Sequence, residues 1–344
     1  MYVDLKLPQP RQRQGLAELA EAGRRAEHQG YDALWSAESA GDPFLPLVPA
    51  AQSTEHLRLG TAVAVAFARN PMSLAYTAHH LQVLSGGRLL LGLGSQVKPH
   101  IERRFGMPWS KPAARMHEFI EALRAIWTCW QTGSDLDFRG EFYSHTLMPP
   151  FFAPDPSPWG LPKIYLAAVG GRMTEVAGAV CDGLLPHPFT TERFLRVQTI
   201  PMLEKGRRKS GRDLTDFSVS LSGLVVTGET EEDMTRAAAG VRRQIAFYGS
   251  TPAYQDVLSL HGWEDLGTEL IARSKSDDAD RWERMGDLID DEILNTFAVV
   301  AEPDRLGAAV HARFGGLVER FSFYAPYDHD PAIWLPAVAE LNAS

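Results

Sequence analysis

Eight short apolar segments recur along the chain, and segments with helical periodicity separate them. Strands that are apolar throughout and alternate with helices pair in parallel and are buried on both faces. Eight such units close into a barrel, so the sequence predicts an α/β fold of the (β/α)8 TIM-barrel type. The strand candidates are residues 2–7, 33–38, 57–65, 88–94, 163–169, 183–187, 217–226 and 318–324.

The helix candidates are recognised by apolar stripes and by one capping signal. The clearest stripe keeps i, i+3, i+4, i+7 spacing over four turns. Its members are Met116, Phe119, Ile120, Leu123, Ile126, Trp127 and Trp130. A second stripe comprises Met173, Val176, Ala177 and Val180. A third helix is expected to open at Asn70 and Pro71, an N-cap followed by proline at the first helical position.

Two segments are longer than a unit of one strand and one helix requires. Residues 132–161 are interpreted as a hairpin and an extended connector, and residues 250–295 as mainly helical. The acidic run SDDADRWERMGDLIDDE in the second segment is either a solvated helix face or a lid over the barrel mouth. We expect one domain over residues 1–344, with insertions near 132–161 and 250–295.

The composition and net charge indicate which class of ligand the protein binds. The formal net charge is −9, with Lys and Arg scattered, which argues against binding to nucleic acid or to an anionic membrane. A small-molecule substrate is therefore expected. The N-terminal stretch has no signal-peptide pattern and no apolar stretch is long enough to span a membrane, so we expect a cytoplasmic protein. Cys129 and Cys181 are interpreted as packed thiols, and no metal-binding motif is recognised.

Candidate site residues follow from the strand assignments, because barrels of this kind carry their chemistry at the carboxyl ends of the strands. These ends are Glu38, residues 62–66, residues 94–98, residues 169–173 and His187. Lys98 and Gln96, within the third of these groups, are candidates for contacts to a ring or a substrate.

An anion site is expected where the fifth strand ends in Val169. Gly170 and Gly171 let the backbone approach a ligand closely, the first helical turn presents free N–H groups, and Arg172 adds positive charge. This combination predicts a phosphate site. The alternative is that the two glycines only make a tight turn.

The glycines at the end of the fourth strand are interpreted differently. Gly92 and Gly94 do not complete a dinucleotide fingerprint, because the position of its third glycine is Val97. A glycine in a strand often marks the close approach of another body. We expect Gly92 and Gly94 to clear room for a flat ring.

Seven stretches, in this order, resemble the luciferase-like monooxygenase superfamily, in the branch that uses the deazaflavin coenzyme F420. They are QGYDALWSAE, LRLGTAVAVAFARNP, LSGGRLLLGLGS, FGMPWSKPAARMHEFIEALRAIW, FRGEFY, PKIYLAAVGGRMTEVAGAVCDGLL and VVAEPDRLGAAVHARFGGLVERFSFYAP. The resemblance covers nearly the whole chain. It implies a barrel that holds a flavin-type ring at its carboxyl-terminal mouth.

The resemblance also implies roles for particular residues. The family's third strand bears a bulge, often with a non-prolyl cis peptide, and the matching bond is Ala62 to Val63. The family's phosphate contacts match Val169, Gly170, Gly171 and Arg172, where the residues themselves predict an anion site. Gly94, Ser95 and Gln96 complete the cofactor-binding candidates.

Two departures from the family pattern bear on the reaction. Alcohol and sugar-phosphate dehydrogenases of the family have a catalytic histidine where this chain has Glu38, and the sugar-phosphate enzymes have a glutamate where it has Val97. Reduction of an activated C=C or C=N bond by the reduced deazaflavin is then expected, since that direction needs a proton donor. Glu38 is a general acid, an orienting acceptor or a group that pins a loop. His187 is either catalytic or a structural histidine.

Three functions are therefore considered. The first is an F420-dependent oxidoreductase, the second an FMN-dependent monooxygenase of the same fold, and the third a flavin-binding barrel without catalysis. We also expect a homodimer. The substrate itself is set by variable loops and cannot be derived from the fold.

Overall fold

The computed structural model describes residues 1–7 and 15–343. In this part of the chain, one sheet has the strand order β11-β10-β12-β1-β2-β3-β5-β8-β9, with β4 beside β5 and β9 paired back to β10. The sheet therefore closes on itself, and the predicted (β/α)8 barrel is confirmed. Its eight main strands are β1 (Tyr2–Lys6), β2 (Ala33–Ser36), β3 (Arg58–Thr61), β5 (Leu89–Gly94), β8 (Lys163–Ala168), β9 (Gly183–Pro186), β10 (Ser218–Val226) and β12 (Arg320–Tyr324).

These strands coincide with the eight predicted segments to within a few residues. The two-residue strands β4 (Ala64–Val65) and β11 (Val299–Val300) pair in parallel with β5 and β10. The predicted segment of residues 57–65 is divided into β3 and β4 by residues 62 and 63. This interruption of the strand is part of the candidate active site.

Contacts within the chain group into two compact units. One unit comprises Leu5–Leu185 and Met202–Ser218, and the other comprises Met1–Asp4, Pro186–Pro201 and Val219–Ser344. We refer to them as the first-half unit and the second-half unit.

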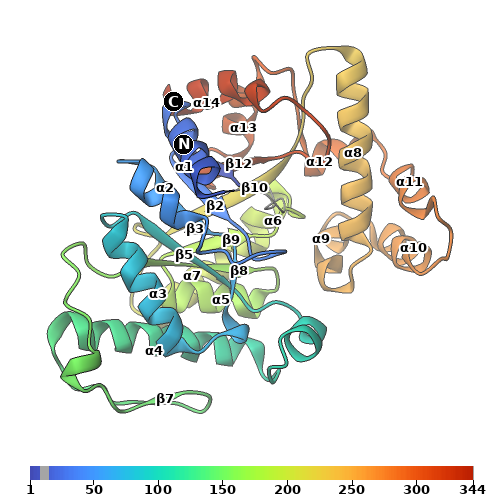
Figure 1. The fold of residues 1–344 in the computed structure, drawn as a ribbon. Coiled ribbons are helices and arrows are strands. Elements are labelled where there is room, and N and C mark those ends of the chain that lie inside the picture. The colour runs from blue at the N-terminus through green and yellow to red at the C-terminus, as the bar shows by residue number, and fades with distance from the viewer. Residues whose placement is uncertain (8–14, 344) are drawn as a thin grey trace. The chain divides into compact units, whose positions relative to one another are not determined.

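In the first-half unit, helix α4 (Pro112–Thr132) packs between α3 (Pro71–Leu84) and α5 (Gly171–Val180), as Figure 1 shows. All seven residues of the predicted α4 stripe are buried. Asn70 caps α3 through a bond from the Met72 N–H to its side chain (2.8 Å), as predicted. The unit also contains α1 (Leu16–His28) and α2 (Leu47–Ser53), which pack on each other.

The predicted hairpin after α4 is present. Strands β6 (Phe138–Arg139) and β7 (Ser144–His145) pair antiparallel within residues 132–161. The connector that follows leaves Phe151 and Trp159 exposed.

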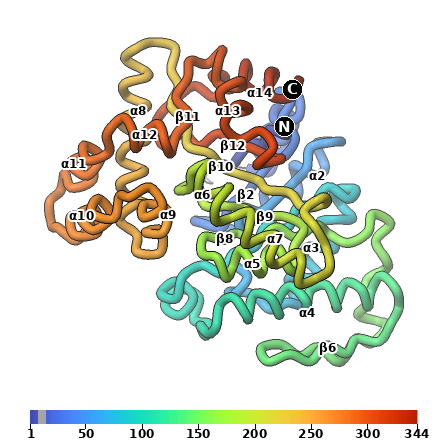
Figure 2. The backbone as a smooth tube through the Cα atoms, turned by 180° about the vertical axis from the view of Figure 1, so that it is seen from behind, coloured from blue at the N-terminus to red at the C-terminus, as the bar shows by residue number. Residues whose placement is uncertain are grey.

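In the second-half unit, residues 250–295 are mainly helical, as predicted. Helices α10 (Glu264–Ser274), α11 (Arg281–Gly286) and α12 (Asp291–Phe297) pack along α8 (Glu231–Gly249), and Figure 2 shows this group from behind. Their apolar side chains share one buried cluster with those of α8 and with Leu224 and Val226 of β10, so the segment packs on a barrel strand as well as on α8. Its role as a lid stays a prediction. The remaining helices of this unit are α6 (Glu192–Phe194), α9 (Gln255–Leu260), α13 (Leu306–Phe314) and α14 (Leu335–Ala343), while α7 (Ile200–Lys209) spans the boundary between the units.

Two further features are the state of the cysteines and the length of the apolar helices. Cys129 and Cys181 are both buried and unbridged, as predicted, and burial raises the pKa of the Cys181 thiol. No described helix is sufficiently long and apolar to cross a membrane.

A buried ion pair holds the strand that closes the barrel. The Arg320 guanidinium in β12 donates two hydrogen bonds, of 2.8 and 2.5 Å, to the Asp4 carboxylate in β1. Side-chain exposure is 4% for Arg320 and 0% for Asp4. Because both charges are buried, removing one partner leaves the other in the interior without the counter-charge of this pair.

We therefore expect Arg320→Met to lower the free energy of unfolding by about 3 to 5 kcal/mol in urea titrations. The control is Arg24→Met, because Arg24 pairs with Glu21 on the surface, with both side chains more than half exposed. That change should cost about 1 kcal/mol or less. Equal losses in the two variants would contradict a structural role for the buried pair.

Candidate active site

A bulge separates β3 from β4 at the barrel mouth. The Ala62–Val63 peptide bond is cis, as the sequence predicted. The Ala62 N–H donates to the Ser36 carbonyl (2.7 Å), and the Glu38 N–H donates to the Val63 carbonyl (3.2 Å). The bulge is thus bonded to the end of β2, and both of its residues are half-buried.

The glycines of β5 make room for this bulge. A Cβ at Gly92 would lie 1.7 Å from the Thr61 carbonyl oxygen, and a Cβ at Gly94 would lie 2.7 Å from Cγ2 of Val63. The body that approaches them is therefore the chain itself. The interpretation that Gly92 and Gly94 clear space for a flat ring was wrong, because Thr61 and Val63 already fill that space. Gly94 is buried, so it can influence a ligand through Val63.

Glu38 is held as a hydrogen-bond acceptor. Its Oε2 accepts from the Val65 N–H (2.7 Å) and from Arg69 (2.5 Å), and its side chain is 8% exposed. Arg69 also donates to the Val65 carbonyl (3.1 Å) and lies 3.5 Å from Asp42. Charge-assisted bonds of this kind are stronger than hydrogen bonds between neutral groups. Among the three roles considered for Glu38, these contacts favour pinning of the loop.

Arg69 was missed by sequence reasoning. It directly precedes the Asn70 cap of α3, and a cation there is ordinary in a surface loop. Only the fold reveals that β2 and the start of α3 bring Glu38 and Arg69 together.

The start of α5 leaves an open backbone surface. Gly170 is the N-cap, with φ −84°, and the N–H groups of Met173 and Thr174 both bond to its carbonyl. The N–H groups of Gly171 and Arg172 have no acceptor among the described residues. A Cβ at Gly170 would meet nothing within 4 Å, and one at Gly171 would meet only Met202, at 3.5 Å. The turn does not itself require glycine, so the turn-only alternative loses its support.

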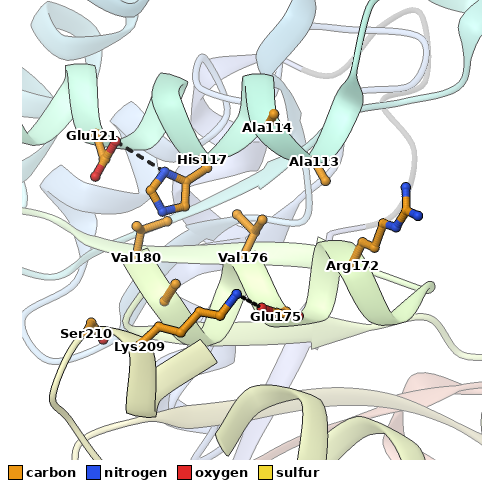
Figure 3. A pocket seen from close by; sticks show the side chains of 11 residues that line it. Ala113, Ala114, His117, Glu121, Arg172, Glu175, Val176, Val180, Lys209 and Ser210 are labelled. Carbon is orange, nitrogen blue, oxygen red and sulfur yellow. Dashed lines mark ion pairs between the residues drawn. The ribbon is translucent and has the colours of Figure 1, made fainter. Parts of the chain in front are cut away.

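Arg172 extends from this turn along a recess between α4, α5 and α7. The recess has a volume of about 650 Å³. Figure 3 shows Arg172 at one end and Lys209 at the other, with Val176 and Val180 between them. His117 pairs with Glu121, and Glu175 pairs with Lys205 and Lys209. Arg172 forms no ion pair with any described residue and is exposed, so it is available to an anion at the start of α5.

The end of β5 turns sharply. Gln96 has φ +59°, a left-handed conformation that is uncommon for a residue other than glycine. Its side-chain oxygen accepts from the Val97 N–H (3.0 Å), and its carbonyl accepts from the Ser95 hydroxyl (3.0 Å). Such backbone strain clusters at ligand sites. Lys98, two residues on, is exposed and lies 3.9 Å from Glu102.

His187 belongs to the second-half unit, in an aromatic cluster. Its ring stacks on Tyr254 (centroids 4.4 Å apart) and meets Tyr248 edge-on (4.6 Å). Nδ1 accepts from the Phe189 N–H (3.1 Å), so in the neutral ring the proton is on Nε2. Burial raises the pKa of both tyrosines. These contacts fit a structural histidine, the alternative to a catalytic one, and both tyrosines were missed because nothing local marks them.

The first-half unit therefore contains all the predicted cofactor-binding residues together with Glu38. Bonds within it connect Glu38, Ala62, Val63 and, through β4, Gly94. Val169, Gly170, Gly171 and Arg172 form a second group at the start of α5.

The closed parallel barrel, with polar and glycine-rich loops at the carboxyl ends of its strands, has the (β/α)8 architecture. The model of the luciferase-like monooxygenase family matches residues 4–320, and the chain belongs to that family.

Two relatives in Mycobacterium tuberculosis show the range of similarity. The uncharacterized protein Rv1360 is 51% identical over 305 residues, which cover 89% of each chain. Rv3520c, provisionally named a coenzyme F420-dependent oxidoreductase, is 30% identical over 313 residues, covering 83% of this chain and 84% of its own.

Two solved structures share the fold. The coenzyme F420-dependent tetrahydromethanopterin reductase of Methanopyrus kandleri superposes with a TM-score of 0.73 at 17% identity, covering 98% of this chain and 96% of that one. A type II Baeyer–Villiger monooxygenase of Pseudomonas putida, in complex with FMN, superposes with a TM-score of 0.65 at 17% identity, covering 99% of this chain and 96% of that one.

The contacts of Glu38 predict a stability effect. Glu38→Ala leaves the Val65 N–H and the Arg69 guanidinium without their acceptor, so it should lower the free energy of unfolding by about 2 to 4 kcal/mol. Glu38→Gln keeps one acceptor oxygen and should cost about 1 kcal/mol.

Urea unfolding of both variants measures this, with Glu102→Ala as the control. Glu102 makes only a long, exposed contact to Lys98, and its loss should cost about 0.5 kcal/mol or less. If Glu38→Ala matched the control, Glu38 would not pin the bulge.

Proposed function

We propose that this chain is an F420-dependent oxidoreductase that reduces an activated C=C or C=N bond of a small organic substrate. The observation that carries the proposal is the open backbone at the start of α5, where the N–H groups of Gly171 and Arg172 and the Arg172 guanidinium have no partner among the residues that the structure describes. This donor set suits a phosphate. The names of Rv3520c and of the Methanopyrus reductase support the deazaflavin as the cofactor.

Different residues bind the phosphate and the ring of the cofactor. The N–H groups of Gly171 and Arg172 and the Arg172 side chain bind the phosphate, with the dipole of the ten-residue helix α5 behind them. The Ala62–Val63 bulge supports one face of the ring, and Glu38 with Arg69 keeps the bulge in place. When bound in its reduced form, the deazaflavin supplies a hydride to the substrate.

An FMN-dependent monooxygenase is the second candidate. The Pseudomonas monooxygenase with FMN has the same fold, and a donor set for phosphate does not distinguish FMN from the deazaflavin. The two cofactors differ in the ring and in their reaction with oxygen, so binding must be measured for both.

Titration of the purified protein with each cofactor, followed by absorbance and fluorescence, tests the proposal. We expect F420 to bind at least about tenfold more tightly than FMN. Gly170→Leu should weaken F420 binding about tenfold or more, because its side chain projects into the open space before the N–H groups, while the melting temperature changes little.

The matched control is Gly15→Leu, at another position where a Cβ meets nothing within 4 Å. It should change neither quantity. Tighter binding of FMN would favour the monooxygenase. A Gly170→Leu protein that melts early but binds F420 normally would instead restore the turn-only interpretation.

We further propose a homodimer. The exposed apolar side chains of α3 and of the connector after the hairpin lie close together in the first-half unit, since the Tyr76 hydroxyl bonds to the Phe152 carbonyl (2.6 Å). They are Val83, Leu84, Phe151, Phe152 and Trp159. Exposed apolar side chains gathered on neighbouring elements commonly mark an interface. Sedimentation equilibrium should give a dimer for the wild type and a weakened one for Leu84→Glu. A monomeric wild type would contradict the proposal.

A further inference from the structure

The recess between helices α4, α5 and α7 is only partly used by the proposed function. Its volume is about 650 Å³, within the range of about 300 to 1,000 Å³ that is typical of small-molecule sites. All of the residues that line it belong to the first-half unit. The proposed phosphate site takes only the end that contains Arg172, so the rest of the recess is open to another ligand.

The recess stays open because the side chains around it are small. Ala113 and Ala114, in the first turn of α4, and Ala179 of α5 carry only a methyl group and leave the space unfilled. One wall is fixed, since Gly178 lets α5 pack closely on α7, and a Cβ there would lie 2.2 Å from the Leu203 carbonyl oxygen. The recess is therefore a preformed feature of the helix packing.

One side of the recess is a single face of α5. Arg172, Val176 and Val180 lie four residues apart, so they follow one another along that face, and Figure 3 shows them in this order. The distance from Arg172 to Val180 corresponds to about 12 Å along the helix axis. A ligand that starts at the guanidinium therefore meets an apolar surface over the next two turns.

Arg172 is the charge that the recess offers to a ligand. His117 pairs with Glu121 (Nδ1 to Oε2, 3.2 Å), and the carboxylate of Glu175 pairs with Lys209. Arg172, in contrast, has no ion pair with any residue that the structure describes. A ligand charge placed over the valines would lose water without gaining a partner, which is unfavourable. The recess therefore suits a ligand with one anionic end and an apolar body.

We propose that the recess binds a medium-chain acyl carboxylate, a ligand other than the cofactor and the substrate of the proposed function. The carboxylate pairs with the Arg172 guanidinium, which can donate two parallel hydrogen bonds to it. The chain, of about eight to ten carbons for a surface of this length, lies along Val176 and Val180. Because Arg172 also serves the proposed phosphate site, the carboxylate and the cofactor compete.

The first test needs no cofactor. Isothermal titration calorimetry with straight-chain carboxylates, each kept below the concentration at which it forms micelles, gives the affinity as a function of chain length. From hexanoate to decanoate, each added methylene should tighten binding about two- to fourfold, since apolar surface leaves water along the recess. Beyond decanoate the gain per methylene should fall, because the chain then extends past Val180.

Two ligands related to decanoate separate the head group from the chain. Acetate keeps the carboxylate without the chain, and decyltrimethylammonium keeps the chain with the opposite charge. Both should bind at least about tenfold more weakly than decanoate. Acetate that binds as tightly as decanoate would leave only an anion contact, and equally tight decyltrimethylammonium would leave only an apolar surface. Either result would overturn the proposal.

Two variants locate the ligand. Arg172→Met removes the cation and Ala113→Phe fills part of the recess, so each should weaken decanoate binding about tenfold or more. Arg24→Met and Ala17→Phe change exposed positions of α1 and should bind decanoate as the wild type does. Because Arg172 is exposed, its variant decides the test if Ala113→Phe fails to fold. An unchanged affinity in Arg172→Met, or no binding by the wild type, would overturn the proposal.

Competition separates this inference from the proposed function. Saturating decanoate should weaken F420 binding about tenfold or more, and F420 should weaken decanoate binding by the same factor. If decanoate binds through Arg172 but F420 does not bind, the proposed function fails and this site stands. If F420 binds and no carboxylate does, this site fails and the proposed function stands. Binding of both without competition would contradict the shared use of Arg172, and titration of Arg172→Met with each ligand would show which assignment is wrong.

Discussion

The arrangement of the site depends on parallel pairing of the strands. Because the barrel strands run in the same direction, their carboxyl ends meet at one rim, and residues far apart in the chain become neighbours there. Glu38, the Ala62–Val63 bulge and the start of α5 come from three separate segments. None of these segments forms a site alone, so any change that opens the barrel would disperse the site as a whole.

The bulge shows how packing prepares such a rim. Gly92 admits the Thr61 carbonyl and Gly94 admits the Val63 side chain, so β5 can accept a neighbouring strand that is interrupted. Glu38 and Arg69 then bond to Val65, just beyond the interruption. If β3 continued as a regular strand, its backbone would not project toward the barrel mouth. Gly92, Gly94 and the Glu38–Arg69 ion pair therefore all support the irregular backbone segment at the bulge.

Much of this arrangement could be predicted from the sequence, because it follows from local pattern. The α4 stripe, the Asn70 cap and the eight apolar segments all reflect periodicity or capping, which act over a few residues. The roles of Gly92 and Arg69 could not be predicted, because each depends on a partner about 30 residues away. Gly170 was recognised because its setting, between a strand and a helix, is itself local.

In the function we propose, the deazaflavin phosphate binds at the start of α5 and the ring contacts the Ala62–Val63 bulge. A crystal structure of the protein with F420 bound tests this most directly. We expect phosphate oxygens within about 3 Å of the Gly171 and Arg172 nitrogens, and the ring in contact with Ala62 and Val63. A phosphate bound elsewhere, with the α5 start facing only solvent, would contradict the account.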